Sequence, residues 1–570
     1  MNKILKYTLC AALVAGMASC SDNYLETSPE SSTSKTELFD SPEAAQFAVN
    51  GLGRLMSKQY LSTQGYNGEG TVYAYIAEFP GDGTQKLAYS GWQNIIKNNY
   101  NQSNTNTNVH VAWYYYYRVI GNANQILANI PEEFASTGIE KEWSFIKAQA
   151  LTIRAYAYTM LSQIYSRRWT YRNGESRGVV LRLDTSNDPK ECASLKIVLD
   201  QVYEDLDEAL ALFEFSGQDR ASDIDMRWLT NPDVAHAVYS RAALVKNDWQ
   251  TAVTHSQAAR KGYSIMGIDE YVAGFNTANK EWIWEVFEDD TQPIYYYSFY
   301  NYMSGSCAGS ASRTYPTLIS KQIVDPIDPA DQRLAIFAIP TEAEIANLVQ
   351  IARDNDSELE SPKIQPGTED SKVFIDYYST SVVTEGDYFN RVQTDFVKKG
   401  RLYSTTKIGL YQGTKFIVKS GVGDGCIPIF RAAEMIYNEA EAQFRLGNEN
   451  AVRELLNEAT QPYNANYNCT KTGDELWNEL IAYRKFDLWS EGHSWFDLKR
   501  WGVDMVRKTW ADGGSWATYF AGDGTNGKTG GNWGPNDKNY WTMNIPTMET
   551  NYNNKVVSQE DDDWKLGTDY

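Results

Sequence analysis

The sequence predicts a mainly α-helical protein in which a scaffold of paired helices carries long irregular insertions. Apolar residues recur at alternating steps of three and four in several segments of the 570-residue chain, which is the spacing of one helix face. Between these segments lie long stretches rich in Gly, Asp, Asn, Ser and Tyr that lack this periodicity. Because long irregular segments on a rigid scaffold commonly carry binding function, we expect the ligand site in these insertions.

Four segments carry an unbroken apolar stripe and are predicted to be helices. The stripes run over 146–164, 198–213, 234–245 and 429–444. Shorter partner helices are expected directly after two of them, at 248–262 and at 450–459. Gly447 stands where a left-handed residue would end the fourth stripe.

Small alanines alternate with large residues in two of these helices, as in Ala235-His236-Ala237 and Ala440-Glu441-Ala442. Small side chains let antiparallel helices approach closely in pairs, which is typical of a tetratricopeptide-like scaffold. The 34-residue period of that repeat is poorly matched, so the prediction depends on helix pairing and not on a regular repeat.

The first residues are predicted to direct export and not to belong to the folded domain. Lys3 and Lys6 precede a mostly apolar run over 7–17, as in a signal peptide. Small residues then stand directly before Cys20, and this end of the segment resembles a bacterial lipoprotein signal, in which cleavage leaves an acylated cysteine first. We therefore expect 1–19 to be a lipoprotein signal peptide and Cys20 to carry the lipid. An ordinary secretory peptide is the alternative.

The rest of the chain is predicted to be one domain on a short tether. Residues 20–34 are rich in Ser, Thr, Glu and Pro, which is typical of a flexible linker, and the domain is expected over 35–570. The helical scaffold would take up about 108–263 and 427–502, and the insertions about 61–107, 264–425 and 513–539.

Composition excludes several classes of protein. The formal charge is −21 and becomes −23 once Lys3 and Lys6 leave with the signal peptide, so a nucleic-acid binder is disfavoured. After the first two dozen residues no stretch of about 20 apolar residues occurs that would span a bilayer as a helix. The remaining cysteines, which allow three pairings or free buried thiols, are Cys192, Cys307, Cys426 and Cys469.

Motifs of common catalytic sites are missing from the sequence. The four histidines are scattered and form no i, i+4 pair, and no P-loop, dinucleotide fingerprint or Gly-x-Ser-x-Gly elbow is found. A structural calcium ion at Asp325, Asp328 and Asp331, or at 561–563, is less favoured than solvated turns, because neither run has the spacing of a known calcium loop. We expect no other cofactor. A glycosidase would need two carboxylates, but the acids of the helices occupy solvated faces.

Aromatic residues are the most informative feature of the insertions. The chain holds 17 Trp and 39 Tyr, and Tyr residues crowd the segment 295–302. A flat ring can stack on the apolar face of a sugar while polar neighbours bind its hydroxyls. Packing of these rings onto the helices is the alternative for any single Tyr. Trp92 is the better candidate, because Gly91 and Asn94 beside it predict an exposed turn.

The C-terminal segment 480–502 resembles the SusD/RagB family. The resemblance is carried by Glu491-Gly492-His493, followed by Trp495-Phe496-Asp497-Leu498 and Arg500. Further matches lie at 147–155, 331–333, 429–442 and 545–546. Glu491, His493, Asp497 and Arg500 are expected to cap and tie together the last helices and not to catalyse a reaction.

The resemblance implies a surface-exposed, lipid-anchored protein of the outer membrane without catalytic activity. Such a protein captures oligosaccharide and delivers it to a SusC-like, TonB-dependent transporter over which it closes as a lid. The negative charge favours a neutral glycan. Two alternatives stay open: a peptide-capturing, RagB-like lipoprotein, and, less favoured, a secreted glycoside hydrolase.

By placement in the family, the two main insertions are expected to converge on one glycan-binding surface. The first insertion would contribute Tyr66, Asp82 and Trp92. The second would contribute Tyr296, Tyr300, Tyr302 and Asp387.

Overall fold

The computed structural model describes residues 38–57, 66, 68–87, 90–98, 103–131, 138–219, 224–288, 298–355, 381–420, 423–510, 512–517, 520 and 542–558. The signal peptide, Cys20, the tether, Tyr296 and the acidic run 561–563 lie outside the described residues. Within these ranges, no helix is both long and apolar enough to cross a membrane.

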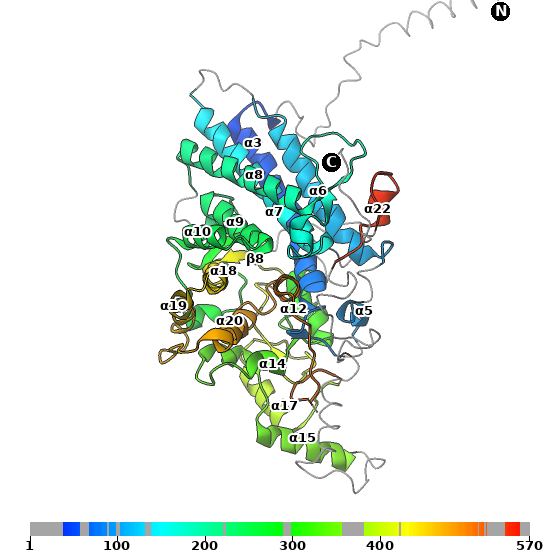
Figure 1. The fold of residues 1–570 in the computed structure, drawn as a ribbon. Coiled ribbons are helices and arrows are strands. Elements are labelled where there is room, and N and C mark those ends of the chain that lie inside the picture. Colours follow the sequence, from blue (N-terminus) through cyan, green and yellow to red (C-terminus); the bar gives the residue numbers. More distant parts are fainter. Residues whose placement is uncertain are drawn as a thin grey trace, which may run out of the picture.

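Helices make up most of the described chain, which confirms the predicted fold class (Figure 1). The long ones are α3 (Pro42–Ser57), α6 (Thr107–Leu127), α7 (Glu140–Tyr165), α8 (Leu195–Ser216), α9 (Pro232–Lys246), α10 (Trp249–Arg260), α15 (Glu342–Asn355), α18 (Ala432–Arg445), α19 (Glu449–Thr460), α20 (Gly473–Asp487) and α21 (Ser494–Trp501). The four helices predicted from apolar stripes and the two predicted partner helices are therefore present.

Local signals in the sequence set the ends of these helices. The side chain of Ser194 accepts a hydrogen bond from the backbone N–H of Ile197 and begins α8, and Asn231 begins α9 in the same way. Gly217 ends α8 with a φ of 63°, and Asn247 ends α9 with a φ of 58°. Both take the left-handed conformation that satisfies the last carbonyls of a helix.

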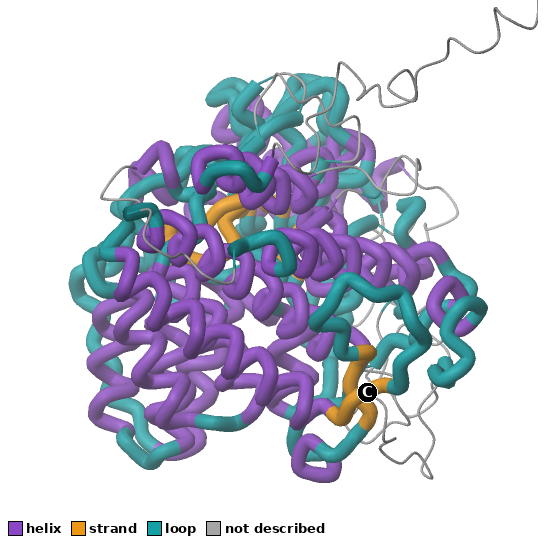
Figure 2. Tube along the Cα trace, turned by 90° about the horizontal axis from the view of Figure 1, so that it is seen from above, coloured by secondary structure: helices purple, strands orange, loops and turns teal. Residues whose placement is uncertain are grey.

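The scaffold helices pack in pairs, as a tetratricopeptide-like arrangement requires. Helix α7 packs against α8, α9 against α10 and α18 against α19, while α10 also contacts α18. The last contact joins the two parts of the scaffold across the second insertion. Figure 2 shows helices lying side by side over much of the molecule, with loops mainly at its edges. Ala235, Ala237 and Ala440 are fully buried, which explains why small residues stand at these positions.

A two-stranded ribbon closes the second insertion at its base. Strand β4 (Trp282–Val286) pairs antiparallel with β8 (Ile427–Arg431), with Trp282 opposite Arg431 and Val286 opposite Ile427. The fourth apolar stripe was predicted as helix from residue 429, but the helix begins at Ala432. The first residues of that stripe belong to β8 instead, because a strand distant in sequence pairs with them.

Short elements build the insertions and link them to each other. Strands β1 (Thr84–Gln85), β5 (Leu318–Ile319), β7 (Gln412–Gly413) and β6 (Phe337–Ala338) form a four-stranded sheet in the order β1-β5-β7-β6. Since β1 comes from the first insertion and the others from the second, the sheet joins the two. Strands β2 (Arg177–Val180) and β3 (Cys192–Ser194) form a separate ribbon beside α8.

The remaining short helices lie mainly in the insertions. They are α4 (Gly68–Thr71), the π-helix η2 (Val72–Glu78), α5 (Gln93–Ile96), η3 (Arg172–Gly174), η4 (Ile224–Met226), α11 (Ile268–Tyr271), α12 (Phe299–Met303), α13 (Ala311–Thr314), α14 (Lys321–Val324), η5 (Gln332–Ile336), α17 (Gly386–Val392), η7 (Gln393–Val397) and α22 (Thr547–Thr550).

Two further predictions concern cysteines and calcium. Cys192, Cys307, Cys426 and Cys469 are buried, and no disulfide joins them in the described chain.

The carboxylate of Asp331 accepts hydrogen bonds from Arg333, and Asp325 pairs with Lys321. The described residues contain no group of three or more side chains placed to hold a metal ion.

Candidate functional site

The two insertions do converge, but their aromatic residues meet inside the molecule. The indole N–H of Trp92 donates a hydrogen bond to the Tyr75 hydroxyl at 2.9 Å. The ring of Tyr302, from the second insertion, lies 4.9 Å from the ring of Tyr75 and 6.1 Å from that of Trp92. Phe79 and Tyr315 complete this aromatic cluster at 5.3 and 5.7 Å from Trp92.

Lys86 holds the aromatic cluster in place. Its ammonium donates hydrogen bonds to the carbonyls of Tyr302 and Tyr315 and to the hydroxyls of Ser312 and Thr317. The same ammonium lies 4.7 Å from the Trp92 ring. Burial lowers the pKa of Lys86 well below its usual value, and these acceptors replace the water that burial removes. Lys86 of the first insertion thereby holds the segment 302–317 of the second insertion in place.

The predicted exposure of Trp92 is wrong, and Tyr300 and Tyr302 follow the packing alternative. The side chain of Trp92 is only 7% exposed, although Gly91 and Asn94 beside it are exposed as expected. Tyr300 and Tyr302 are 0% exposed, and the Tyr300 hydroxyl donates to the backbone carbonyl of Cys426. At this turn the backbone faces solvent and the Trp92 ring faces the interior, because burial of the ring is favourable in free energy relative to its exposure to water.

The other predicted site residues are held apart from one another. Tyr66 is half-buried beside the aromatic cluster and donates to Asn108 at 3.0 Å. Asp82 is 4% exposed and accepts from the Lys485 ammonium at 2.7 Å. Asp387 is exposed on α17, which lies beside α15 at the lower end of the view in Figure 1. That these residues bind a glycan stays a prediction, and Tyr296 lies outside the described residues.

The acidic residues of the C-terminal segment form a buried ion-pair network. Arg431 bonds to Glu281 at 2.6 Å, to Asp487 at 2.9 Å and to Glu491 at 2.7 Å. Lys415 also pairs with Glu491, and Arg333 with Asp487. Burial by itself would raise the pKa of Asp487, but the surrounding cations outweigh it and lower that pKa to about 2.

A second buried network ties the last helices together. Arg484 of α20 binds Asp497 of α21 at 2.6 Å, and Arg500 of α21 pairs with both Asp497 and Glu441. Burial, together with the nearby Arg241, lowers the pKa of His493 well below its ordinary value and keeps its imidazole neutral. These contacts agree with the structural role expected for the segment.

Four carboxyl groups of the described chain, each at most 1% exposed, have raised pKa values: Glu69, Glu78, Glu281 and Glu288. Glu69 is fully buried and accepts hydrogen bonds from the hydroxyls of Tyr115, Tyr116 and Tyr156. Burial raises the pKa of Glu78 to about 7, and its carboxylate accepts from the backbone N–H groups at the start of α21. A general acid must contact the bond that it protonates, so carboxyl groups buried to this degree do not serve as one here.

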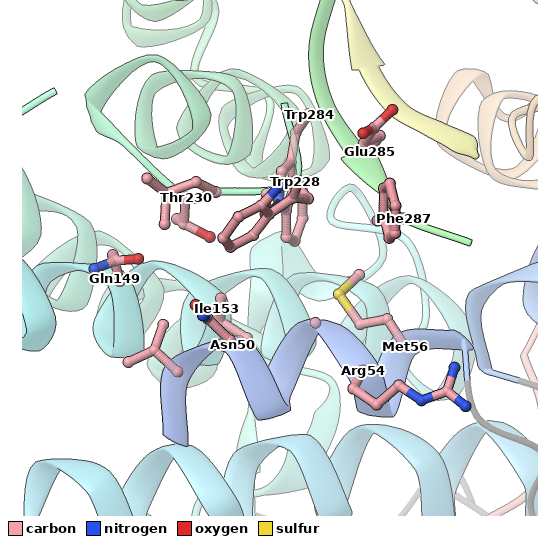
Figure 3. A pocket seen from close by; sticks show the side chains of 13 residues that line it. Asn50, Arg54, Met56, Gln149, Ile153, Trp228, Thr230, Trp284, Glu285 and Phe287 are labelled. Atoms are coloured by element: carbon pink, nitrogen blue, oxygen red, sulfur yellow. Dashed lines mark hydrogen bonds between the residues drawn. The ribbon is translucent and has the colours of Figure 1, made fainter. Parts of the chain in front are cut away.

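An open cleft of about 330 Å³ lies between α3, α7 and the end of β4. Figure 3 shows Trp228, Trp284 and Phe287 on one side, facing Ile153 and Met56 on the helices, with Gln149 near one end and Arg54 near the other. The ring of Phe287 is 41% exposed and that of Trp228 is half-buried. Unlike the aromatic cluster, this cleft has rings that a ligand can reach.

The backbone around Trp228 is fixed by β4. The indole of Trp284 donates to the carbonyl of Trp228 at 3.1 Å, and the N–H of Glu285 donates to the carbonyl of Arg227 at 3.1 Å. Trp284 is itself held by edge-to-face packing on Tyr156 at 5.2 Å. The Trp228 ring is therefore presented by a rigid support, and its side chain can be changed without removing the backbone contacts that hold it.

Polar groups complete the lining of the cleft. The carbonyl oxygen of the Asn50 amide accepts from Gln46 at 2.8 Å, and Gln46 is bonded in turn to Gln149. Arg54 stands exposed at the end of α3. Rings that can take the apolar face of a sugar, with an amide and a guanidinium beside them, form a combination suited to carbohydrate.

Two family models together match nearly the whole chain. The model described as SusD family matches 243–564, which is more than half of the residues. The chain belongs to the SusD family. A second model, described as starch-binding associating with outer membrane, matches 23–244.

Individual proteins resemble this SusD-family chain along its length. SusD-like protein P38 of Formosa agariphila is 24% identical over 525 residues, which are 87% of this chain and 91% of that protein. A SusD-like carbohydrate binding protein from Bacteroides vulgatus has 20% identity and a TM-score of 0.68, covering 90% of this chain and 97% of that one. A SusD superfamily protein from Bacteroides thetaiotaomicron has 17% identity and a TM-score of 0.66, covering 91% and 100%. These structures share the fold.

Sequence reasoning missed the cleft of this SusD-family chain. Trp228 and Phe287 were not singled out, because neither stands in an aromatic run. One signal was present: Trp228 follows a polar stretch and stands three residues before Asn231, which with Pro232 marks a helix start. A lone Trp at such a junction lies at the scaffold surface, where a loop and a helix meet. Its pairing with α3 and β4 could not be deduced from the sequence.

Proposed function

We propose that this chain is a glycan-binding lipoprotein of the cell surface that captures oligosaccharides without cleaving them. It is anchored in the outer membrane through Cys20 and passes its ligand to a SusC-like, TonB-dependent transporter. The ligand is a neutral oligosaccharide or polysaccharide, as the net charge of −21 favours.

The match to the starch-binding model carries this proposal. That model covers 23–244, and within this range lie α3, α7 and the loop at Trp228, which form most of the cleft in Figure 3. We place the principal glycan contacts there, with the half-buried ring of Trp228 and the exposed ring of Phe287 stacking on the sugar.

The absence of catalysis is supported by the state of the acidic groups. Retaining and inverting glycosidases need two carboxyl groups on either side of the scissile bond, one of them with a raised pKa. In the described chain, Glu281 and the carboxylates of the C-terminal segment are held by buried cations, and Glu69, Glu78 and Glu288 are sealed in the interior. Glu285, the acidic residue that lines the cleft, has no second carboxyl group among the lining residues.

Affinity electrophoresis tests the binding function. We expect the protein without its signal peptide and Cys20 to be retarded by at least one neutral polysaccharide among soluble starch, galactomannan, arabinoxylan and laminarin. Trp228→Ala should weaken that retention at least about tenfold, because truncating an aromatic anchor typically costs about 2 kcal/mol. Trp249→Ala is the matched control, since Trp249 is equally half-buried but lies on α10 outside the cleft.

A reducing-end assay on the same mixtures tests the lack of catalysis. Binding without new reducing ends agrees with capture, and steady release of them would make the protein a hydrolase. Unchanged retention of Trp228→Ala would remove the cleft in Figure 3 from the binding site. Bound peptides in mass spectra of protein purified from its native membrane, with no retention on any glycan, would favour the peptide-capturing alternative.

A further inference from the structure

A second and larger cleft lies on a different part of the molecule. It has a volume of about 590 Å³ and is formed by the C-terminal half of α6, the loop 182–187 and the segment 549–553 that begins in α22. Figure 1 shows α22 in red at the edge of the molecule, on the side of α6. This C-terminal cleft shares no lining residue with the cleft in Figure 3.

Hydrogen bonds hold the walls of the C-terminal cleft in place. The Asn124 amide of α6 donates to the carbonyls of Arg182 and Asp184 at 2.9 and 3.0 Å. Arg154 donates to the same amide at 2.9 Å. On the opposite wall, Asn553 donates to the carbonyl of Lys190 at 2.8 Å. Three distant segments of chain are thus fixed relative to one another, so the cleft is preformed.

The charged groups of the C-terminal cleft are already engaged. Glu549 accepts hydrogen bonds from the Trp113 indole at 3.2 Å and from Asn553 at 2.8 Å, and it pairs with Arg182 at 3.5 Å. Asp184 accepts hydrogen bonds from Ser186, whose backbone N–H lies at 2.9 Å, and from Lys190 at 3.1 Å, and these bonds lower the pKa of Asp184 to about 2. With opposite charges paired in this way, the cleft offers no surplus cation to an anionic ligand.

The groups that remain available are neutral. Gln125, Thr185 and Asn187 are exposed at the cleft, and their side chains make no hydrogen bond with the rest of the described chain. Tyr552 lies at the rim and is 87% exposed, more than any other large hydrophobic residue of the described chain. The Tyr552 ring is therefore open to stacking by a ligand.

An exposed ring beside amides and a hydroxyl matches a sugar. The ring can stack on the apolar face of a pyranose, and the amides can donate to and accept from its hydroxyls. A protein partner would instead favour a continuous apolar patch with few unsatisfied polar groups. We propose that the C-terminal cleft is a second binding site for neutral oligosaccharide, separate from the cleft at Trp228. This inference rests on the proposed function.

A second site would act through avidity. A polysaccharide that reaches both clefts binds the second one as an intramolecular event, so the affinity for the polymer exceeds that of either site alone. A short oligosaccharide occupies one cleft at a time and gains nothing. The difference between polymer and trisaccharide therefore distinguishes a two-site protein from a one-site protein.

Isothermal titration calorimetry tests the second site. The probe is a polysaccharide that retains the wild-type protein, together with its trisaccharide. We expect Tyr552→Ala to weaken binding of the polymer about tenfold and to reduce the number of trisaccharide sites from two to one. The double variant Gln125→Ala/Asn187→Ala should also weaken binding of the polymer and reduce the number of trisaccharide sites. Tyr403→Ala is the control, because Tyr403 is also exposed but lies outside both clefts.

The possible outcomes separate this inference from the proposed function. Wild-type affinity and stoichiometry in the Tyr552→Ala protein, with Trp228→Ala impaired, would overturn the second site and leave the proposed function standing. If no polysaccharide binds the wild-type protein, both are overturned. Unchanged glycan binding with lost co-purification of a membrane partner would assign the C-terminal cleft to protein docking and overturn the carbohydrate assignment. Thermal unfolding of each variant confirms that the fold is retained.

Discussion

Arg431 shows what the charged residues of the C-terminal segment do. Its guanidinium contacts three carboxylates in the interior, and the exposed fraction of each partner is at most 4%. Removing one member of such a network leaves uncompensated buried charge, which typically costs about 3–5 kcal/mol. A residue pattern that suggests acid–base chemistry in the sequence therefore stabilises the core in the structure.

Glu78 makes stability depend on pH near neutrality. Burial raises its pKa from 4.5 to about 7, against the opposing effect of the backbone N–H groups of His493 and Gly492. The folded protein thus binds this proton more tightly than the unfolded chain does. The contribution to stability is complete below about pH 4.5 and is lost as the pH rises through 7, a loss of about 3 kcal/mol at most.

We expect Glu78→Gln to remove this pH dependence. The amide mimics the protonated carboxyl group, so its oxygen can still accept from the N–H groups at the start of α21. In urea unfolding between pH 5 and 8, the free energy of unfolding of the variant should rise relative to that of the wild-type protein as the pH increases. Glu342→Gln, at an exposed position on α15, should leave the pH dependence unchanged. Parallel curves for Glu78→Gln and wild type would contradict the raised pKa.

Helices were predictable because their signals are local. An apolar stripe, a Ser or Asn at the start and a left-handed residue at the end all lie within one segment, and α8 and α9 show all three. Strand β8 was missed because it exists only through its pairing with β4. The same five residues, Ile427–Arg431, lead directly into a helix, and their sequence does not distinguish the two states.

Gly492 connects α20 to α21 at a point where no side chain fits. Its φ is 86°, and a Cβ there would lie 2.6 Å from the buried ring of Tyr73. We expect Gly492→Ala to destabilise the protein by clearly more than the roughly 1–2 kcal/mol of a left-handed alanine. Gly447→Ala is the matched control, because its φ is 83° and nothing lies within 4 Å of the added Cβ. Chemical unfolding of both variants measures the difference, and equal losses would rule out the clash.

At the scale of the whole molecule, the insertions serve two purposes. Their aromatic residues build an inner cluster that joins the two insertions, with Trp92 and Tyr302 in contact and Lys86 beneath them. The two open clefts lie instead between insertion and scaffold, or between the scaffold and the C-terminal segment. Placement in the family thus predicted that the insertions converge, but neither it nor the abundance of aromatic residues predicted which rings would remain accessible.

Anchoring is the remaining prediction for the whole protein. We expect Cys20→Ala to move the protein from the membrane fraction to the soluble fraction of a bacterial host that processes lipoproteins, since the lipid supplies the membrane affinity. Cys10→Ala, within the predicted signal peptide, should leave fractionation unchanged. Metabolic labelling with a fatty acid, followed by cell fractionation, measures the acylation and the membrane localisation of each variant. Membrane retention of an unlabelled Cys20→Ala protein would contradict the lipid anchor.

The sequence by itself determined the helical scaffold, the position of the insertions and the family, because each depends on residues close together in the chain. Tertiary structure decided which aromatic rings are accessible. Trp92 and Trp228 both stand at loop positions, yet the first is sealed by Tyr75, Phe79 and Tyr302 while the second faces an open cleft. Burial depends on what distant segments place against a side chain, and that information is spread over the whole chain.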